Sequence, residues 1–518
     1  MASVITESQL LGALSEQLDI PLVAEEEFPD NIPLENISFD FLRANNILPI
    51  DLQAGELKIV VSDPTETTAV EAISASYGFR VKLHLAAKDA IGRRLDEMYE
   101  SHGAVMQRIF DDVEKEEEPG IEGEGEVDQL RDLAQDKGII QLVNVLVEKA
   151  VNERASDIHV EPEERFVKVR YRIDGIMYER ESLPIRMQPA ITSRIKLLSN
   201  MNIAERRLPQ DGRIKGKYAE RDIDVRVSTI PTVYGESIVM RILDRSSAFI
   251  SLEGIGFDRE LLNIYEELIK KPYGMILITG PTGSGKTTTL YASLDKINST
   301  EKKIITIEEP VEYLMNGINQ INVKPKIGLT FANGLRHIVR QDPDVIMVGE
   351  VRDLETANIS IHAALTGHLL FSTLHTNDAP GAITRLMDMG VENYLVSSTL
   401  IGVMAQRLVR RICDDCKVSY DIDKDVKEAL GLKVDNVFKG EGCESCSHTG
   451  YRGRIGIFEI LTINDTIREL IMKEATVREL KEKAVAMGMR TLRQDGVEKI
   501  EKGLTTVDEV LRVTQVEL

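Results

Sequence analysis

Residues 280–287 form the segment whose chemistry is easiest to read. They run Gly-Pro-Thr-Gly-Ser-Gly-Lys-Thr, after an apolar stretch at Met275–Thr279 and before a helical pattern that opens at Thr288. In this strand–loop–helix setting, glycines let backbone N–H groups turn inward around phosphates, and the helix N-terminus adds a favourable dipole. Lys286 is expected to reach the β- and γ-phosphates, and Thr287 to bind Mg²⁺. The predicted nucleotide-binding residues are Gly280, Pro281, Thr282, Gly283, Ser284, Gly285, Lys286, Thr287 and Thr288.

Carboxylates follow two further apolar runs of strand length. Val345–Val348 leads into Glu350, and Ile304–Ile307 leads into Glu308 and Glu309. In enzymes with such a phosphate loop, an acid at the end of a neighbouring strand manages Mg²⁺ and the attacking water. Glu350 is therefore predicted to orient or deprotonate that water, although an acid that only caps a strand gives the same pattern. The pair after Ile307 could serve the metal or could form a solvated turn.

Two histidines flank a fourth apolar run. His368 precedes Leu369–Leu374, and His375 follows it. Imidazole can sense or donate to a phosphate, but a lone histidine is more often a packing residue. The residues alone leave both interpretations open.

All four cysteines lie close together in the sequence, as two Cys-x2-Cys pairs with 26 residues between them. Four thiolates suit tetrahedral Zn²⁺, and a closed four-sulfur site leaves no position for substrate. We predict a structural zinc site, with four unmetallated thiols as the alternative, and a small protrusion over Lys417–Gly442. The predicted ligands are Cys413, Cys416, Cys443 and Cys446.

The elements around these residues indicate a multidomain α/β protein. From Phe249 onward, apolar strands alternate with helical segments, which is typical of a parallel sheet, and Asn464–Leu518 is helical by pattern. Upstream, an amphipathic helix at Ile139–Ala155 precedes alternating runs typical of a sheet with one solvated face. These runs are Phe166–Ile173, Asp222–Ile230 and Ser237–Leu243.

Composition changes suggest where the domains end. Residues 111–127 combine acid and glycine with almost nothing apolar, which is typical of a flexible linker. The predicted parts are an N-terminal domain at 1–105, an acidic linker at 106–128, a second N-terminal domain at 129–246 and an α/β domain at 247–518. The last contains a four-cysteine subdomain at 410–450 and a helical region at 462–518.

Overall composition narrows the function. The chain has 518 residues, with 63 basic against 85 acidic side chains and a net charge of −22, which disfavours a nucleic-acid partner. Met1–Ile20 lacks the basic start and apolar core of a signal peptide. No apolar stretch approaches the roughly 20 residues that span a bilayer. We expect a soluble, cytoplasmic chain that meets a membrane only through partners.

Four segments together resemble the secretion (traffic) ATPases of type II secretion and type IV pilus systems. They are similar, in the family's order, to its Walker A, aspartate box, Walker B and histidine box. The segments are GPTGSGKT, TIEEPVEY, VRQDPDVIMVGEVRD and AALTGHLLFSTLHTNDA. Upstream segments resemble the family's second N-terminal domain: ASDIHVEP, YRIDG, RLPQDGRI and DIDVRVSTIPTVYGESIVMRIL.

The resemblance implies a homohexamer with a RecA-like P-loop ATPase core, a PAS-like α+β second N-terminal domain and ATP between the two. It places Glu308 and Glu309 on the aspartate box and gives His368 and His375 a γ-phosphate-sensing role. Glu309 replaces the aspartate usual at that place, so its share in metal handling is open. The implied catalytic residues are Glu350, Lys286, Glu308, Glu309, His375, His368, Arg213 and Arg226.

Several arginines also acquire a role from the resemblance. Arg213 and Arg226 fall where the family supplies guanidinium groups to the nucleotide phosphates, and a planar guanidinium suits developing phosphoryl charge. An exposed strand arginine is the alternative for each. Arg336 and Arg340 are weaker candidates, for contacts between subunits.

The cysteine segment and the N-terminal residues refine the hypothesis. The cysteine segment resembles an insertion of type II secretion ATPases and some pilus-extension ATPases, which retraction ATPases generally lack. No arginine precedes Arg43, and Gly12 is the only glycine before Gly55, so we predict no cyclic-dinucleotide site near the N-terminus. The resemblance instead implies docking of the N-terminal domain to inner-membrane assembly-platform proteins.

The sequence therefore predicts a cytoplasmic, hexameric ATPase, using Mg²⁺ and structural Zn²⁺, that powers type II secretion by driving pseudopilus assembly at the inner membrane. Pilus extension by the same chemistry is the nearest alternative. A nucleotide-gated scaffold without hydrolysis and a DNA-translocating motor are more distant ones.

Overall fold

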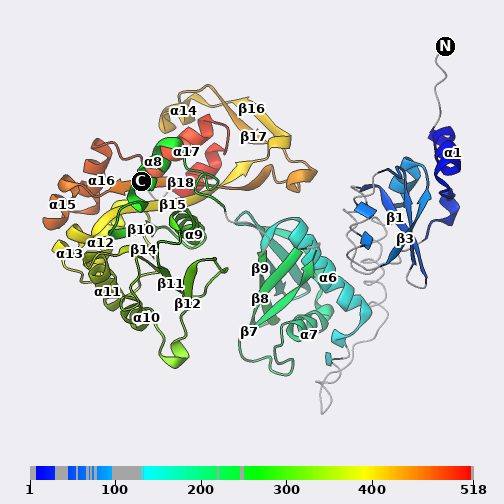
Figure 1. Cartoon of the computed structure of the whole chain (residues 1–518), viewed down its shortest axis with the longest axis horizontal. Coiled ribbons are helices and arrows are strands. Elements are labelled where there is room, and N and C mark those ends of the chain that lie inside the picture. Colours follow the sequence, from blue (N-terminus) through cyan, green and yellow to red (C-terminus); the bar gives the residue numbers. More distant parts are fainter. Residues whose placement is uncertain are drawn as a thin grey trace. The chain divides into compact units, whose positions relative to one another are not determined.

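The computed structural model describes residues 7–29, 42, 45–53, 56–65, 69–70, 73–74, 79–95, 130–131, 133–218, 221–244 and 250–514. These residues fall into two compact units, Met1–Arg172 with Met177–Asp244 and Ile173–Ile176 with Arg245–Leu518. The predicted acidic linker, Arg43 and Gly55 lie outside the described residues. Within the described part, no helix combines the length and the apolar composition that crossing a bilayer requires. Figure 1 shows the elements in chain order.

The N-terminal part is a small α/β assembly. Strand β2 pairs antiparallel with β1 and parallel with β3. The predicted strand at Leu57–Ser62 is β2, whose apolar residues Leu57, Ile59 and Val60 are fully buried. The elements are α1 (Glu7–Leu18), η1 (Glu25–Glu27), β1 (Ile47–Gln53), β2 (Glu56–Val61) and β3 (Arg80–Leu85).

The second N-terminal sheet has six strands, in the order β6-β5-β4-β9-β8-β7. Buried and half-exposed residues alternate along β5, as the sequence predicts for a sheet with one solvated face. Helix α6 is the predicted amphipathic helix; Asp136 caps its N-terminus, and the buried Tyr171 of β5 donates to the Leu146 carbonyl at 2.7 Å. The elements are α6 (Lys137–Asn152), β4 (Ala155–Pro162), β5 (Phe166–Ile173), β6 (Ile176–Pro184), η2 (Ile185–Met187), α7 (Gln188–Leu198), β7 (Gln210–Tyr218), β8 (Arg221–Thr232) and β9 (Gly235–Asp244).

The C-terminal unit is built on a seven-stranded sheet in the order β12-β11-β13-β14-β10-β15-β18. Pairing is parallel from β12 to β15, and β18 runs antiparallel to β15. The predicted α/β class is confirmed. Its strands are β10 (Gly274–Thr279), β11 (Ile304–Glu308), β12 (Ile318–Asn322), β13 (Val345–Val348), β14 (Leu369–Leu374), β15 (Leu400–Ile412) and β18 (Tyr451–Thr462).

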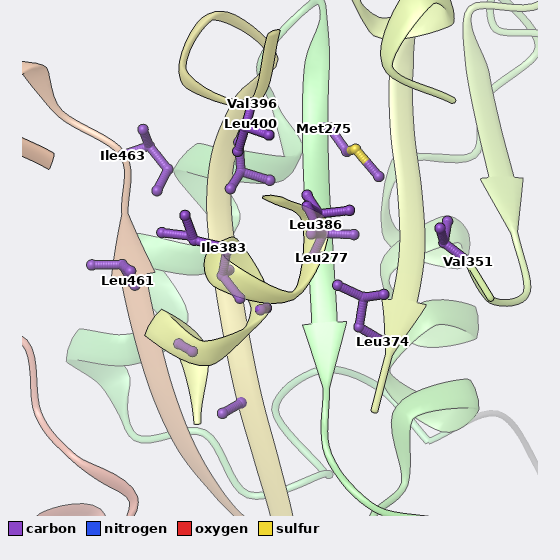
Figure 2. Close-up of a cluster of buried hydrophobic side chains, with 14 of the residues drawn as sticks. Met275, Leu277, Val351, Leu374, Ile383, Leu386, Val396, Leu400, Leu461 and Ile463 are labelled. Atoms are coloured by element: carbon purple, nitrogen blue, oxygen red, sulfur yellow. The ribbon is translucent and has the colours of Figure 1, made fainter. Parts of the chain in front are cut away.

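Helices cover both faces of this sheet, because its central strands are apolar on both sides. All six residues of β10 are buried, with Leu277 facing one core and Ile276 the other. Figure 2 shows part of the first core, in which Ile383 and Leu386 belong to the same buried cluster as Leu277. The helices are α8 (Arg259–Ile269), α9 (Lys286–Ile297), η3 (Pro325–Ile327), α10 (Phe331–Ile338), α11 (Leu354–Leu365), α12 (Ala379–Asp388), α13 (Asn393–Thr399), α15 (Asp465–Met472), α16 (Val477–Ala486), α17 (Leu492–Glu501) and α18 (Val507–Thr514).

The segment between the two cysteine pairs forms its own sheet. Strands β16 and β17 pair antiparallel, and α14 connects them. Phe438 and Lys417 of this sheet lie against Gly503 in the α17–α18 turn. The elements are η4 (Asp414–Cys416), β16 (Lys417–Asp421), α14 (Lys424–Leu430), β17 (Asn436–Gly440) and η5 (Glu444–Cys446).

A buried carboxylate fixes α18 to the long strand β15. Glu509 accepts hydrogen bonds from the Arg410 backbone N–H at 2.9 Å, from Arg410 Nη2 at 2.8 Å and from Arg512 Nη2 at 2.8 Å. Burial alone would raise the pKa of Glu509, but the hydrogen bonds from Arg512 and Arg410 outweigh it and lower the pKa to about 2. The ionised form is therefore the one that the native fold stabilises.

Glu509→Gln is expected to reduce the free energy of unfolding of the C-terminal unit at pH 7 by about 2–3 kcal/mol. A carboxyl whose pKa is lowered on folding contributes stability above its unfolded pKa and loses it as pH falls toward 2. The wild-type advantage should therefore shrink between pH 4.5 and 2, as denaturant unfolding at several pH values will show. Glu482→Gln, which removes an exposed partner of Arg478, is the control. An equal wild-type advantage at pH 7 and pH 2.5 would contradict this account.

Candidate active site

The phosphate-loop pattern adopts the geometry that the sequence predicts. The loop leaves β10 at Thr279, and α9 begins at Lys286, with Gly285 at its N-cap in the left-handed region at φ +87°. A Cβ atom on Gly280 would lie 2.5 Å from the Gln406 carbonyl oxygen and 2.6 Å from Ser284 Oγ. The loop backbone therefore packs closely against β15, and only glycine fits at Gly280.

Lys286 lies over this loop. Its Nζ donates to the carbonyl oxygens of Gly280 at 2.8 Å and Pro281 at 3.0 Å. Burial lowers the pKa of Lys286 to about 8; the negative charge of Glu350 acts in the opposite direction, and the positive charge of Arg407 adds to the lowering. Lys286 and Glu350 follow the carboxyl ends of β10 and β13, which both pair with β14, so both residues lie at the carboxyl edge of the sheet.

The backbone around Glu350 is held on both sides. The N–H of Gly349 donates to the Ile307 carbonyl at 2.8 Å, on the β11 side. The N–H of Val351 donates to the Thr373 carbonyl at 3.0 Å, on the β14 side. Glu350 thus projects from a fixed position between the ends of two neighbouring strands.

The side chain of Glu350 is mostly covered, at 17% exposure, and has a guanidinium and an imidazole as neighbours. Arg352 Nη2 forms a close ion pair with Glu350 Oε1, and His375 Nε2 lies 3.6 Å from Glu350 Oε2. Arg352 Nη1 also donates to Glu309 Oε2 at 3.3 Å. The ends of β11, β13 and β14 therefore bring Glu309, Glu350 and His375 to one place.

This arrangement, a phosphate loop beside a carboxylate at the edge of a parallel sheet, has a counterpart among known proteins. The sequence profile of the family described as "Type II/IV secretion system protein" matches residues 132–512. The chain belongs to this family. Like the other members, it is an ATPase. Residues 18–105 match a second profile, that of the MshEN domain.

Individual relatives match nearly the whole chain. The type II secretion system protein E of Xanthomonas campestris is 42% identical over 525 residues, covering 99% of this chain and 91% of that protein. The type IV pilus assembly ATPase PilB of Myxococcus xanthus is 41% identical, covering 98% and 91%. The solved structure of the Legionella pneumophila ATPase DotB aligns at a TM-score of 0.55 and 20% identity, over 73% of this chain and 96% of that one. This last likeness concerns the fold alone.

Glu308 does not share the exposure of Glu309. It is 3% exposed, and Tyr291 Oη donates a short hydrogen bond to its Oε2. Thr306 Oγ1 and Gln320 Nε2 donate to the other oxygen at 2.5 and 3.3 Å. Both oxygens of Glu308 thus accept hydrogen bonds from neighbouring side chains in the interior.

The two histidines lie at opposite ends of β14. His375 follows the carboxyl end and faces Glu350, whereas His368 precedes the amino end, about 20 Å away by strand length. The His368 Nδ1 donates to the Ala363 carbonyl at 2.7 Å. Within its own chain His368 therefore has the contacts of a packing residue, and only His375 belongs to the site around Glu350.

The two predicted arginines face each other across neighbouring strands of the six-stranded sheet. Arg213 of β7 pairs in register with Arg226 of β8, and Arg226 pairs with Arg241 of β9. Residues opposite one another lie on one face of a sheet, so the three arginines form a row. Arg241 Nε donates to Asp157 Oδ1 at 2.9 Å at the end of this row.

The four cysteines are brought together as predicted. Their sulfur atoms lie within 4.8 Å of one another, and three of the separations are 3.8, 3.9 and 3.8 Å. Zinc–sulfur bonds of about 2.3 Å in a tetrahedron place the sulfurs about 3.8 Å apart, whereas a disulfide brings them to about 2.05 Å. The donor set therefore fits a tetrahedral zinc ion.

Arg336 and Arg340 both have partners in their own chain. Arg336 forms an ion pair with Glu355, and Arg340 Nη2 lies 2.8 Å from His337 Nδ1. Their predicted contacts between subunits stay a prediction.

Three residues of these sites were not predicted from the sequence: Arg352, Arg241 and Arg407. Arg407 lies on β15 beside the phosphate loop, is 8% exposed and donates to the Asn377 carbonyl at 2.9 Å. Gln406 and Arg407 interrupt the otherwise apolar run from Leu400 to Val409, and that interruption is the signal that could have singled them out. Nothing in the sequence alone distinguishes Arg352 from other exposed arginines.

Proposed function

We propose that the chain is a hexameric ATPase that powers type II protein secretion by driving assembly of a pseudopilus at the cytoplasmic face of the inner membrane. The observation that carries this proposal is that the loop holding Lys286 follows β10 and Glu350 follows β13, at the carboxyl ends of two strands that both pair with β14. The length over which the chain matches a type II secretion system protein E supports the choice of system.

In the proposed reaction, the loop at residues 280–285 wraps the phosphates and Lys286 neutralises the β- and γ-phosphates. The hydroxyl of Thr287, in the first turn of α9, would hold Mg²⁺, which supplies charge compensation on the phosphate oxygens. Glu350 orients the attacking water and accepts its proton, and His375 is proposed to sense the γ-phosphate. A fixed backbone suits this task, because water must be aimed at phosphorus within a narrow angle.

The arginine row supplies a second source of positive charge. Arg213 and Arg226 are proposed to donate to the nucleotide phosphates, and Arg241 extends their row. Arg241 pairs with Asp157, and the planar guanidinium groups of Arg213 and Arg226 suit an oxyanion such as a phosphate. Turnover would then move the domain that carries them against the ATPase core.

The remaining parts are proposed to serve assembly. The N-terminal domain would dock onto inner-membrane platform proteins, and the four-cysteine zinc subdomain would fix the Lys417–Gly442 segment. Cyclic dinucleotides and nucleic acids are not proposed as ligands. A type IV pilus extension motor is the second candidate, supported by the similarity to PilB along 98% of the chain.

A reconstitution distinguishes the two candidates. Purified chain, 57.9 kDa per subunit, is mixed with the cytoplasmic parts of platform proteins from the type II secretion and type IV pilus operons of the same genome. The proposal expects a six-chain species by native mass spectrometry and ATP turnover raised at least tenfold by the secretion platform. Stimulation by the pilus platform alone would establish the second candidate, and no higher assembly with either platform would refute the hexamer.

A further inference from the structure

One guanidinium in the active site serves two carboxylates that come from different strands. Arg352 Nη2 pairs with Glu350, at the end of β13, and Arg352 Nη1 donates to Glu309 Oε2 at 3.3 Å, at the end of β11. Because two different nitrogens of the fork are used, the group can hold both carboxylates at once. The hydrogen bond to Glu350 also raises the pKa of Arg352, which keeps the guanidinium charged.

The freedom that remains to Glu350 lies in its side chain. Backbone hydrogen bonds at Gly349 and Val351 fix the main chain to the neighbouring strands. The direction of the carboxylate therefore depends on the groups that contact its oxygens.

Those groups divide the two oxygens unequally. Oε1 has the close ion pair with Arg352, whereas Oε2 faces His375 at 3.6 Å, which is beyond a good hydrogen bond. Holding Oε1 restricts the rotation of the carboxylate and leaves Oε2 as the oxygen that can accept from water.

We propose that Arg352 is the positioning residue of Glu350, and that Glu309 acts through Arg352 rather than on the metal. Glu309 anchors the guanidinium from the β11 side, and the guanidinium in turn aims Glu350. This inference rests on the proposed function, because it presumes that Glu350 aims the attacking water.

The length of the Glu309 side chain matters in this arrangement. At 3.3 Å the contact with Arg352 Nη1 is already long, and an aspartate would withdraw the carboxylate by about 1.5 Å, one carbon–carbon bond. If Glu309 bound the metal directly, the Glu309→Asp variant would keep the negative charge and much of the activity. The contact between Glu309 and Arg352, in contrast, should be lost in Glu309→Asp almost as fully as in Glu309→Gln.

The test is a double-mutant cycle on the full chain, with kcat, KM and the affinity for Mg·ATP measured separately. Arg352→Gln and Glu309→Gln are each expected to lower kcat about 30-fold, because a misaimed water costs up to about two orders of magnitude, with KM and affinity within about twofold. The double variant should lose no more than Arg352→Gln alone, since both act through one group. Arg352→Lys should recover part of the rate, because a point charge holds one carboxylate.

Arg478→Gln is the matched control. Arg478 lies on α16, is 86% exposed and pairs along its own helix with Glu482 at 2.7 Å. The Arg478→Gln variant should keep the kcat of the wild type.

Three results would overturn the inference: an unaltered kcat in Arg352→Gln, losses that multiply in the double variant, or full activity in Glu309→Asp with a weakened dependence on Mg²⁺ in Glu309→Gln. The last would assign Glu309 to the metal. Failure of the proposed function looks different, because Glu350→Gln would then keep its turnover.

Discussion

Glu350→Gln is expected to lower kcat for ATP hydrolysis by about 1,000-fold, within the range of about 10²–10⁴ that a general base contributes. ATP affinity should stay within about threefold, because the phosphates are held by the loop and Lys286. The amide keeps the size of the side chain and the contact with Arg352 through its oxygen, but it cannot take a proton from water. Phosphate release and equilibrium binding of a fluorescent ATP analogue, on the same preparation, measure the two quantities.

Lys286→Ala provides the contrast within the same site. Loss of the ammonium group is expected to weaken ATP binding at least 30-fold, about 2 kcal/mol for a charge-assisted hydrogen bond, and to remove turnover with it. A Glu350→Gln variant that binds without turning over, beside a Lys286→Ala variant that does neither, would separate chemistry from binding. Turnover above a tenth of wild type in Glu350→Gln would assign the water to another group.

Sequence reasoning reached the phosphate loop because every requirement of that site is local. The glycines, the lysine and the helix start occupy eight consecutive residues, so spacing alone defines the geometry. The parallel sheet was equally accessible, because β10, β13 and β14 are apolar runs of strand length. The four cysteines belong to the same class, since paired knuckles have few other uses.

The parts that escaped prediction depend on which strand lies beside which. Glu308 and Glu309 are adjacent in sequence, yet one faces Tyr291 in the interior and the other faces Arg352 at the edge. Alternation along β11 separates them, but the sequence does not say which side holds the nucleotide. The histidines show the same difficulty, because the six residues of β14 separate them, so that His368 and His375 lie beyond opposite ends of the strand.

Strand order also explains why two arginines gained importance only in three dimensions. Arg407 lies beside the phosphate loop because β15 is the neighbour of β10, although 127 residues separate Arg407 from Gly280. Arg241 joins the row of Arg213 through the register of β9 on β8. Register and order follow from the packing of the whole sheet, which pairwise spacing in a sequence does not encode.

Removal of the zinc ion that the four cysteines are proposed to hold is the second change with a large expected effect. Between the cysteine pairs only Leu432 and Val437 are buried, and none of the seven residues of α14 is, so this segment contributes little buried apolar surface. A structural zinc site supplies about 10 kcal/mol or more of folding free energy in small metal domains. Cys416→Ser and Cys443→Ser should therefore lose zinc, from one ion per chain to below about 0.2, and should open the segment at residues 417–442 to proteases.

Hydrolysis should respond differently from stability in these variants. The sulfurs lie beyond the last residues of β15 and before β18, whereas the phosphate loop packs against β15 at Gln406, seven residues earlier in the chain than Cys413. The basal turnover of folded Cys416→Ser chains should thus remain within about threefold of wild type, while the protease-sensitive segment unfolds. Ser445→Ala, an exposed position between two of the ligands, is the matched control and should keep its zinc. Metal analysis that finds full zinc in both cysteine variants, or protease resistance unchanged after chelation, would show that the four sulfurs hold no structural ion.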